Sequence, residues 1–208
     1  MTMDVLLLST PNKNIDYPGL SLPVLTAVLR QRGLSVEQRD LNITFRDEIL
    51  TAAGLDGLLE STLPHYAEAC RDSEIELGRL LSFYRFLRRL RDEVGFEALE
   101  DVKKRVQVRD YQWVFDSDER FRNFLSLFKI NRALHYLIDI AVTMSYQQAD
   151  DYLTRKLCLT LDRLRKDVLL MNPLVLGFSV LDIQRRFALR AIEVLRPDFQ
   201  GKIVAGGG

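Results

Sequence analysis

The most constraining feature of this chain is the order of its patterns: strand and helix signals alternate at both ends, and a long stretch of purely helical signal separates them. At the amino end, an apolar run over residues 5–8 precedes a helical pattern over residues 20–32 and an alternating strand pattern over residues 34–39. Gly33 is expected to end the helix, because glycine adopts a positive φ without strain. This order predicts one βαβ unit with parallel strands and a right-handed crossover.

The middle of the chain, residues 45–171, has the periodicity of helices throughout. Two apolar stripes are typical of helix faces that pack against a core. The first consists of Leu153, Leu157, Leu161, Leu164 and Val168, and the second of Phe121, Phe124, Leu125 and Phe128. The run at residues 116–119 precedes the second stripe and has the form of a capping box. The segment is too long for an ordinary crossover, so it predicts four or five helices inserted between the second and third strands.

At the carboxyl end the α/β pattern returns, with strand patterns over residues 174–180 and 202–205 and a helical pattern over residues 184–195. A doubly wound parallel sheet with the strand order 2-1-3-4 follows. The predicted fold is therefore α/β, a Rossmann-like (flavodoxin-like) sheet with a large all-helical insertion. Its predicted parts are residues 1–44 and 172–208, which are the two halves of one α/β domain, and the insertion at residues 45–171.

Composition excludes several classes of function. The chain has 208 residues with 29 basic and 29 acidic side chains, so we expect no general attraction to nucleic acid or to an anionic membrane. No apolar run approaches the roughly 18 residues of a membrane helix, and the first residues lack the basic region of a signal peptide. Cys70 and Cys158 are too isolated to suggest a disulfide framework or a metal-binding spacing. These features predict a cytoplasmic protein.

Three loops are expected to meet at the carboxyl edge of the sheet, because each follows the end of a parallel strand. They comprise residues 9–14, 179–184 and 206–208. Short polar side chains and free helix N–H groups there suit a large ligand that carries amides and a phosphate, and glycines allow its close approach. The same serines and aspartate equally suit helix caps, and both interpretations stay open for any single residue. Since the glycine loop breaks off as it begins, we expect the chain to be the front part of a longer protein.

The order of these motifs resembles the amino-terminal domain of cobalamin-dependent radical S-adenosylmethionine proteins. In that family a proline-rich loop leads into a helix that ends in leucine, arginine and glycine. A later strand ends in Gly-Phe-Ser with a glutamine after it, and a fourth strand leads into a double glycine. This chain holds each element in that order, in two blocks within residues 5–42 and 174–208.

The resemblance implies a corrinoid site at the carboxyl edge. It places Ser9, Thr10 and Pro11 against the corrin face or its amide side chains. It places Ser179, Val180, Asp182 and Gln184 along the nucleotide tail and the ring edge, and Gly206, Gly207 and Gly208 beside the tail. For Val180, packing in the core is the competing interpretation.

Two family signatures are absent from this sequence. The first is Asp-x-His-x-x-Gly, whose histidine binds cobalt; His65 and His135 both lie in the insertion, so no histidine ligand is expected. The second is CxxxCxxC, whose thiolates bind a [4Fe–4S] cluster at which S-adenosylmethionine reacts. The resemblance therefore implies a cobalamin-binding module that is not catalytic alone. Its expected partner is a missing carboxyl-terminal radical SAM domain that holds the cluster and S-adenosylmethionine, in an enzyme of the methyltransferase type.

Two other functions stay open. The same sheet edge suits a nucleotide or a flavin, with the glycine loop at the phosphate. Alternatively, the insertion is an interaction surface and the sheet is a scaffold.

The insertion carries two further features of note. A basic cluster consists of Arg85, Arg88, Arg89 and Arg91, and its acidic neighbours favour a solvated helix face over a nucleic-acid site. An alternating stretch over residues 106–115 contains Trp113 and two other aromatics. We expect this stretch to anchor the insertion to the sheet, or to cover the crevice as a loop or short strand.

Overall fold

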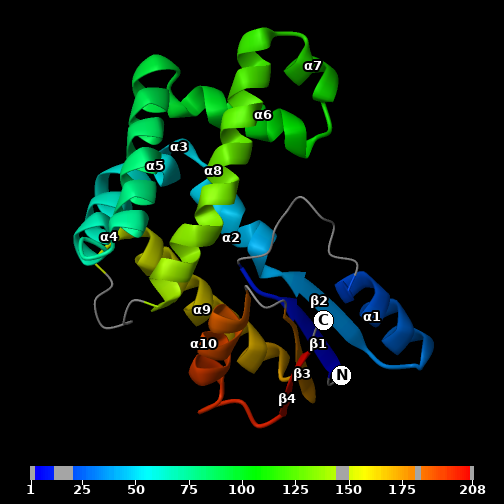
Figure 1. Ribbon diagram of the computed structural model, residues 1–208. Coiled ribbons are helices and arrows are strands. Elements are labelled where there is room, and N and C mark those ends of the chain that lie inside the picture. Colours follow the sequence, from blue (N-terminus) through cyan, green and yellow to red (C-terminus); the bar gives the residue numbers. More distant parts are fainter. Residues whose placement is uncertain (1–2, 12–20, 144–149, 181–183, 207–208) are drawn as a thin grey trace. The chain divides into compact units, whose positions relative to one another are not determined.

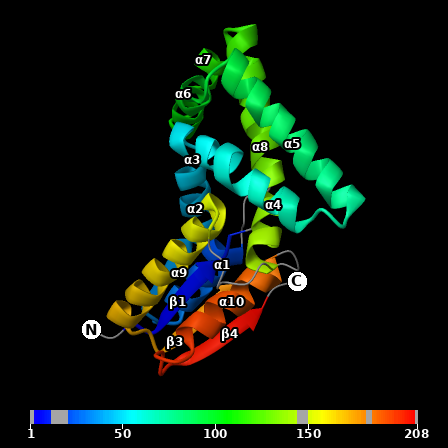
Figure 2. The same ribbon diagram turned by 90° about the vertical axis from the view of Figure 1, so that its left-hand side faces the viewer.

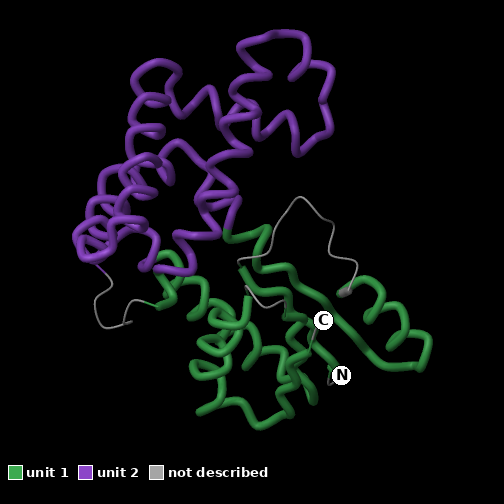
Figure 3. The backbone as a smooth tube through the Cα atoms, in the orientation of Figure 1, with its two compact units in different colours: residues 1–45, 141–146, 156–208 green, residues 46–140, 147–155 purple. Residues whose placement is uncertain are grey.

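The computed structural model describes residues 3–11, 21–143, 150–180 and 184–206. The chain forms two compact units (Figure 3). The first comprises residues 1–45, 141–146 and 156–208, and the second comprises residues 46–140 and 147–155. Within the described part of the chain, no helix combines the length and the apolar character that crossing a bilayer requires.

The first unit is built on a four-stranded parallel sheet with the order β2-β1-β3-β4. The strands are β1 (Val5–Ser9), β2 (Val36–Asp40), β3 (Val175–Ser179) and β4 (Lys202–Gly206). This order, with the helical segment between β2 and β3, confirms the predicted Rossmann-like α/β fold. In the register Ser9 pairs with Asp40 and Ser179, and Ser179 pairs with Gly206, so the four strands end in one row.

Helices cover both faces of this sheet. Helix α1 (Ser21–Gln31) lies on one face, and α10 (Arg185–Leu195) lies on the other together with the part of α9 (Tyr152–Met171) that belongs to this unit (Figures 1 and 2). Both faces of β1 are therefore buried, which explains its unbroken apolar sequence.

The side chains of β1 divide between these two faces. Val5 and Leu7 form a cluster with Leu22 of α1 and Val36 of β2. Leu6 and Leu8 alternate with them and are fully buried.

Gly33 ends α1 as predicted. Its φ is +80°, its N–H donates to the carbonyl of Arg30 at 3.0 Å, and the N–H of Leu34 donates to the carbonyl of Leu29 at 3.2 Å. These two bonds form a Schellman motif, which satisfies the last carbonyls of the helix and turns the chain into β2.

The second unit is helical throughout its described residues (Figure 3). Its helices are α3 (Ala52–Gly57), the π-helix η1 (Leu58–Thr62), α4 (Leu63–Ala69), α5 (Glu74–Glu93), α6 (Phe96–Gln107) and α7 (Tyr111–Phe115). It also holds the start of α9, the part of α2 (Leu41–Ile49) after residue 45 and the part of α8 (Asp118–Thr143) up to residue 140. The prediction of four or five helices was too low, because short helices such as α3 and α7 carry too few turns to give a separate periodic signal.

The two predicted stripes differ in burial. The α9 stripe, from Leu153 to Val168, is buried as its periodicity indicates. On α8, however, Phe121, Leu125 and Phe128 are 38–41% exposed, and the buried face instead carries aliphatic residues such as Ile130 and Leu134. Because α8 is apolar on more than one face, periodicity alone did not identify the face that packs.

The cap of α8 lies one residue after the start of the predicted capping box at residues 116–119, because Asp116 ends α7 (Tyr111–Phe115) and Ser117 caps α8. The Ser117 hydroxyl accepts the N–H of Arg120 at 3.5 Å, as a helix cap does. The position that a capping box fills with glutamate holds Arg120, so the reciprocal bond of that motif is not made.

The two units meet after Phe45 and again within α9, before Lys156. The first unit extends to Phe45, but residues 156–171 also belong to it rather than to the insertion. Two ion pairs within this unit hold that part of α9. Asp167 pairs with Arg39 of β2, and Arg165 Nε donates to Asp198 after α10 at 2.8 Å.

Within the second unit, side chains cap the start of α9. The buried Thr62 hydroxyl accepts the N–H of Leu153 at 3.0 Å and donates to Asp151 Oδ1 at 3.0 Å. Asp151 Oδ1 also accepts the N–H of Thr154 at 3.1 Å. Helix N–H groups that have no partner within α9 are therefore satisfied by Thr62 of η1 and by Asp151.

Candidate functional site

The predicted site residues that the structure describes lie together at the carboxyl edge of the sheet. Ser9, Ser179 and Gly206 are paired in register at the ends of β1, β3 and β4. Thr10 and Pro11 follow β1, Val180 follows β3, and Gln184 stands directly before α10. Asp182, Gly207 and Gly208 lie outside the described residues.

Two hydrogen bonds join these segments. Gln184 Nε2 donates to the carbonyl of Thr10 at 2.6 Å, across 174 residues of sequence. The N–H of Val180 donates to the carbonyl of Gly206 at 2.9 Å, which extends the pairing of β3 with β4. Because Gln184 is only 1% exposed, its bond to Thr10 is shielded from water and fixes the start of α10 to the segment after β1.

Burial divides the site into an inner and an outer part. Thr10 and Gln184 are buried, as are Ser9 and Pro11. Ser179 and Val180 are half-buried, and Gly206 is exposed with no atom within 4 Å of the position that a Cβ would take. A ligand at this edge would therefore meet the ends of β3 and β4 first, with Thr10 and Gln184 in the inner wall.

The Thr10 hydroxyl stands out within that wall. It is fully buried, and Oγ1 has no hydrogen-bond partner among the described residues. A buried hydroxyl without a partner costs about 1–3 kcal/mol of stability, so such groups are rare in native proteins. The hydroxyl therefore has hydrogen-bonding capacity that the described protein groups do not use.

Sequence reasoning missed Asp40, which lies in the same row at the end of β2. Its Oδ1 accepts the N–H of Asn42 at 3.0 Å and that of Ile43 at 3.4 Å, so the carboxylate caps α2. The signal was present in the sequence, since an aspartate stands between a strand pattern and a helical one.

The histidines and cysteines do not form a metal site within the described residues, where no group of three or more potential ligands occurs. His65 and His135 both lie in the second unit, and Arg46 Nη2 lies 3.3 Å from both ring nitrogens of His135. Cys70 and Cys158 are not joined in a disulfide. Burial, with the charge of Glu76, raises the pKa of the Cys70 thiol, which disfavours the thiolate.

The basic cluster of the insertion is largely neutralised by ion pairs. Arg89 pairs with Glu93 at 2.9 Å, Arg88 lies 3.9 Å from Asp92, and Arg91 pairs with Glu60. Its arginines other than Arg91 are well exposed. This arrangement supports the interpretation as a solvated helix face.

The aromatic stretch near Trp113 is helical, because residues 96–107 form α6 and residues 111–115 form α7. The expectation of a loop or short strand there was wrong. Trp113 lies between two cations of its own unit, with the Arg120 guanidinium 4.1 Å and the Arg105 guanidinium 5.1 Å from its ring centre.

We compared the chain with known proteins in three ways. A scan against protein-family models, a search of curated proteins and a search of solved structures each gave no match.

Proposed function

We propose that this chain is a cobalamin-binding module that holds the corrinoid at the carboxyl edge of the sheet. The observation that carries the proposal is the buried Thr10 hydroxyl without a described partner, at an edge where three neighbouring strands end in register. Cobalamin presents many amide groups around its ring and a phosphate in its nucleotide tail. A site for it needs several hydrogen-bonding groups on neighbouring loops, and this edge supplies them.

The burial of the residues suggests a role for each. The half-buried Ser179 and Val180 and the exposed Gly206 would receive the nucleotide tail, together with Asp182, Gly207 and Gly208. The Thr10 hydroxyl would bond an amide of the ring edge. Gln184 would act as a positioning residue, because its amide is already bonded to the Thr10 carbonyl.

In this proposal the bound cobalt supplies methyl-transfer chemistry, and the module positions it. Because the chain has no CxxxCxxC sequence, the cluster, S-adenosylmethionine and the radical step would belong to a separate radical SAM domain. Cys70 and Cys158 are not in a disulfide, which is compatible with a reducing compartment, and we place the protein in the cytoplasm.

Two observations favour cobalamin over a nucleotide or a flavin. The segment between β1 and α1 contains no G-x-G-x-x-G sequence to receive a pyrophosphate. Asp40, at the strand end where dinucleotide-binding folds place an acidic group for the ribose, is engaged in capping α2.

The test is retention of the cofactor. Purified protein is mixed with hydroxocobalamin or, separately, with flavin mononucleotide, and each mixture is passed through a desalting column. We expect a corrin absorbance spectrum at close to one equivalent and no flavin absorbance. Protein that elutes colourless from the first mixture, or yellow from the second, contradicts the proposal.

Two variants make the test specific to the site. Gln184→Leu and Thr10→Val should both retain less corrinoid than the unchanged protein. Gln112→Leu, at an exposed position of α7, is the control and should retain as much. Circular dichroism confirms that each variant is folded.

A further inference from the structure

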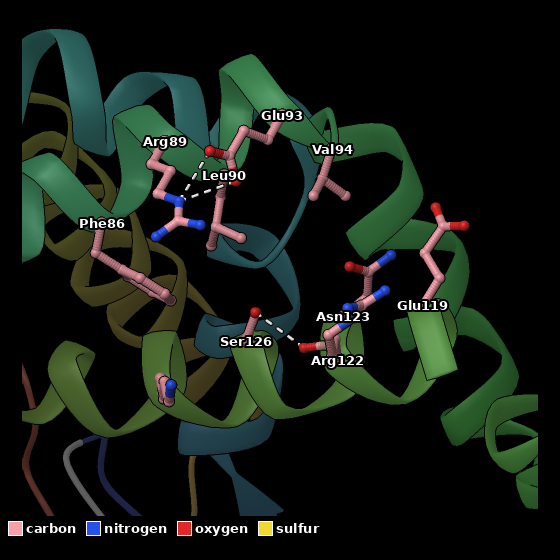
Figure 4. Close-up of a pocket in the computed structure, with 10 residues that line it drawn as sticks. Phe86, Arg89, Leu90, Glu93, Val94, Glu119, Arg122, Asn123 and Ser126 are labelled. Carbon is pink, nitrogen blue, oxygen red and sulfur yellow. Dashed lines mark hydrogen bonds and ion pairs between the residues drawn. The ribbon is translucent and has the colours of Figure 1, made fainter. Parts of the chain in front are cut away.

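Two grooves lie in the second unit, both lined by α5 and α8. The larger has a volume of about 570 Å³ and the smaller a volume of about 480 Å³. Figure 4 shows side chains of α5 and of α8 facing one another across the larger groove. The α5 lining runs from Arg79 in the smaller groove to Val94 in the larger, which corresponds to ~24 Å of helix. This length suits an extended ligand better than a compact one.

Part of the lining of each groove is apolar. Phe83 in the smaller groove and Phe86 in the larger are stacked, with ring centres 6.2 Å apart. Leu90 of α5 and Val94, which follows α5, continue the apolar surface, and Leu137 lines the smaller groove from α8. Such a surface favours a partner that brings apolar side chains at regular spacing.

The charges of the lining are predominantly basic, although the chain as a whole is neutral. Arg89 is neutralised by Glu93, which lies 2.9 Å away. Arg122, Lys129 and Arg132 form no ion pair with any described residue, and Glu119 is the remaining carboxylate in the lining. The grooves therefore present cations that lack an acidic partner.

Asn123 adds a polar group to the lining of the larger groove. No described residue bonds to its amide, and the amide is not among the fully buried polar atoms. It can therefore donate to or accept from a group that enters the groove.

We propose that the two grooves between α5 and α8, named together the α5–α8 groove, form a docking site for an acidic amphipathic α-helix of a partner protein. The apolar stripe of that helix lies on the phenylalanine-rich lining, and its flanking carboxylates meet Arg122, Lys129 and Arg132. A backbone or side-chain group of the helix bonds to Asn123. The proposal depends on the second unit alone and is independent of cobalamin binding.

Two other occupants fit less well. A second copy of this chain in a two-fold dimer would bring the same cations toward one another, which is unfavourable. Single-stranded nucleic acid needs a track of cations along its whole backbone, whereas part of this lining is apolar and Arg89 is already paired.

The test measures fluorescence anisotropy with the full chain. The probe is a fluorescein-labelled peptide of about 16 residues, the length of helix that matches the groove, with leucines at helical spacing and glutamates on both flanks. A second peptide carries lysine at every glutamate position, and a labelled oligothymidylate tests nucleic acid. We expect the acidic peptide to bind at micromolar concentration and the other two probes to bind at least about tenfold more weakly.

Charge variants then locate the site. R122Q/K129Q should weaken binding of the acidic peptide about tenfold, because two ion pairs at a partly exposed surface are removed. The matched control R85Q/R88Q loses the same net charge from exposed arginines of α5 outside the lining and should bind as the unchanged protein does. R122E/K129E should reverse the preference and favour the lysine peptide.

Several results overturn the proposal. These are no binding of the acidic peptide, equal binding of both peptides, or equal effects of R122Q/K129Q and R85Q/R88Q. Tighter binding of the oligothymidylate makes the groove a nucleic-acid site. If sedimentation velocity shows a dimer of the unchanged protein, and R122Q/K129Q is monomeric, the groove is a self-association surface instead.

Discussion

Replacement of Thr10 by valine is expected to stabilise the free protein and to weaken ligand binding. Valine has nearly the shape of threonine, so the packing around the side chain is preserved. The change removes a hydroxyl that is fully buried and without a partner among the described residues. Most substitutions at buried positions destabilise a protein, so an increase in stability here would be a specific outcome.

The size of the effect follows from the burial. An unpaired buried hydroxyl costs about 1–3 kcal/mol, and valine removes that cost while adding a buried methyl group. The free energy of unfolding of the Thr10→Val variant should therefore rise by about 1–2 kcal/mol. With a urea dependence of about 2–3 kcal/mol per molar, this is a shift of the midpoint by roughly 0.3–1 M.

Thr26 offers a matched control in the same unit. Its hydroxyl is also buried, but it donates to Gln38 Oε1 at 2.8 Å. Thr26→Val should therefore lower the free energy of unfolding, by about 0.5–1.5 kcal/mol. Urea denaturation followed by circular dichroism measures both variants. If Thr10→Val destabilises the protein as much as Thr26→Val does, the Thr10 hydroxyl has a partner and the reasoning about the inner wall is refuted.

Three further predictions concern the stability of the two units. Thr62→Val should lower the free energy of unfolding by about 2–4 kcal/mol in urea, because it leaves the Leu153 N–H and Asp151 Oδ1 without the buried hydroxyl. An unchanged midpoint would contradict this role. Gly177→Ala should cost about 1–3 kcal/mol, since its Cβ would lie 2.7 Å from Leu7 Cδ2, whereas Gly78→Ala in the open on α5 should stabilise by about 0.5–1 kcal/mol. Thermal unfolding that ranks these two variants the other way would refute the packing argument. Hydrogen bonds from the Ala52 N–H and from Lys104 lower the pKa of Glu100, so its contribution is present above the ordinary glutamate pKa and is lost as pH falls through the lowered value. Glu100→Gln should therefore reduce the loss of stability on acidification, and an identical pH profile would exclude the effect.

The strand order of the sheet was predictable, because local sequence patterns identify its strands and the helix that joins β1 to β2. The apolar run of β1 indicated a strand buried on both faces, and Gly33 indicated the end of α1. Parallel crossovers then left few possible strand orders. The same reasoning predicted that β1, β3 and β4 end at one edge of the sheet. The register confirms that Ser9, Ser179 and Gly206 lie side by side there.

The rest depended on contacts between segments that are distant in sequence. Periodicity does not show whether the aromatic or the aliphatic face of α8 is buried, because burial depends on which neighbouring helices pack against α8. Residues 156–171 belong to the first unit, in which Asp167 pairs with Arg39 and Arg165 with Asp198, and no local pattern indicates these long-range contacts. That the Thr10 hydroxyl has no partner among the described residues is likewise a property of its three-dimensional surroundings.

A stability cost at Thr10 connects the fold to the proposed function. Domains are stable by only about 5–15 kcal/mol, so an unsatisfied hydroxyl at about 1–3 kcal/mol is a considerable part of the total. Valine would occupy the same volume in the inner wall without that cost. If no group outside the described residues bonds to it, threonine at this position is unfavourable for folding of the free protein. Such local departures from stable folding are typical of binding sites, as the proposed function requires. A ligand that accepts or donates a hydrogen bond there would recover the cost on binding, which is why loss of cobalamin binding and gain of stability should accompany one another in the Thr10→Val variant.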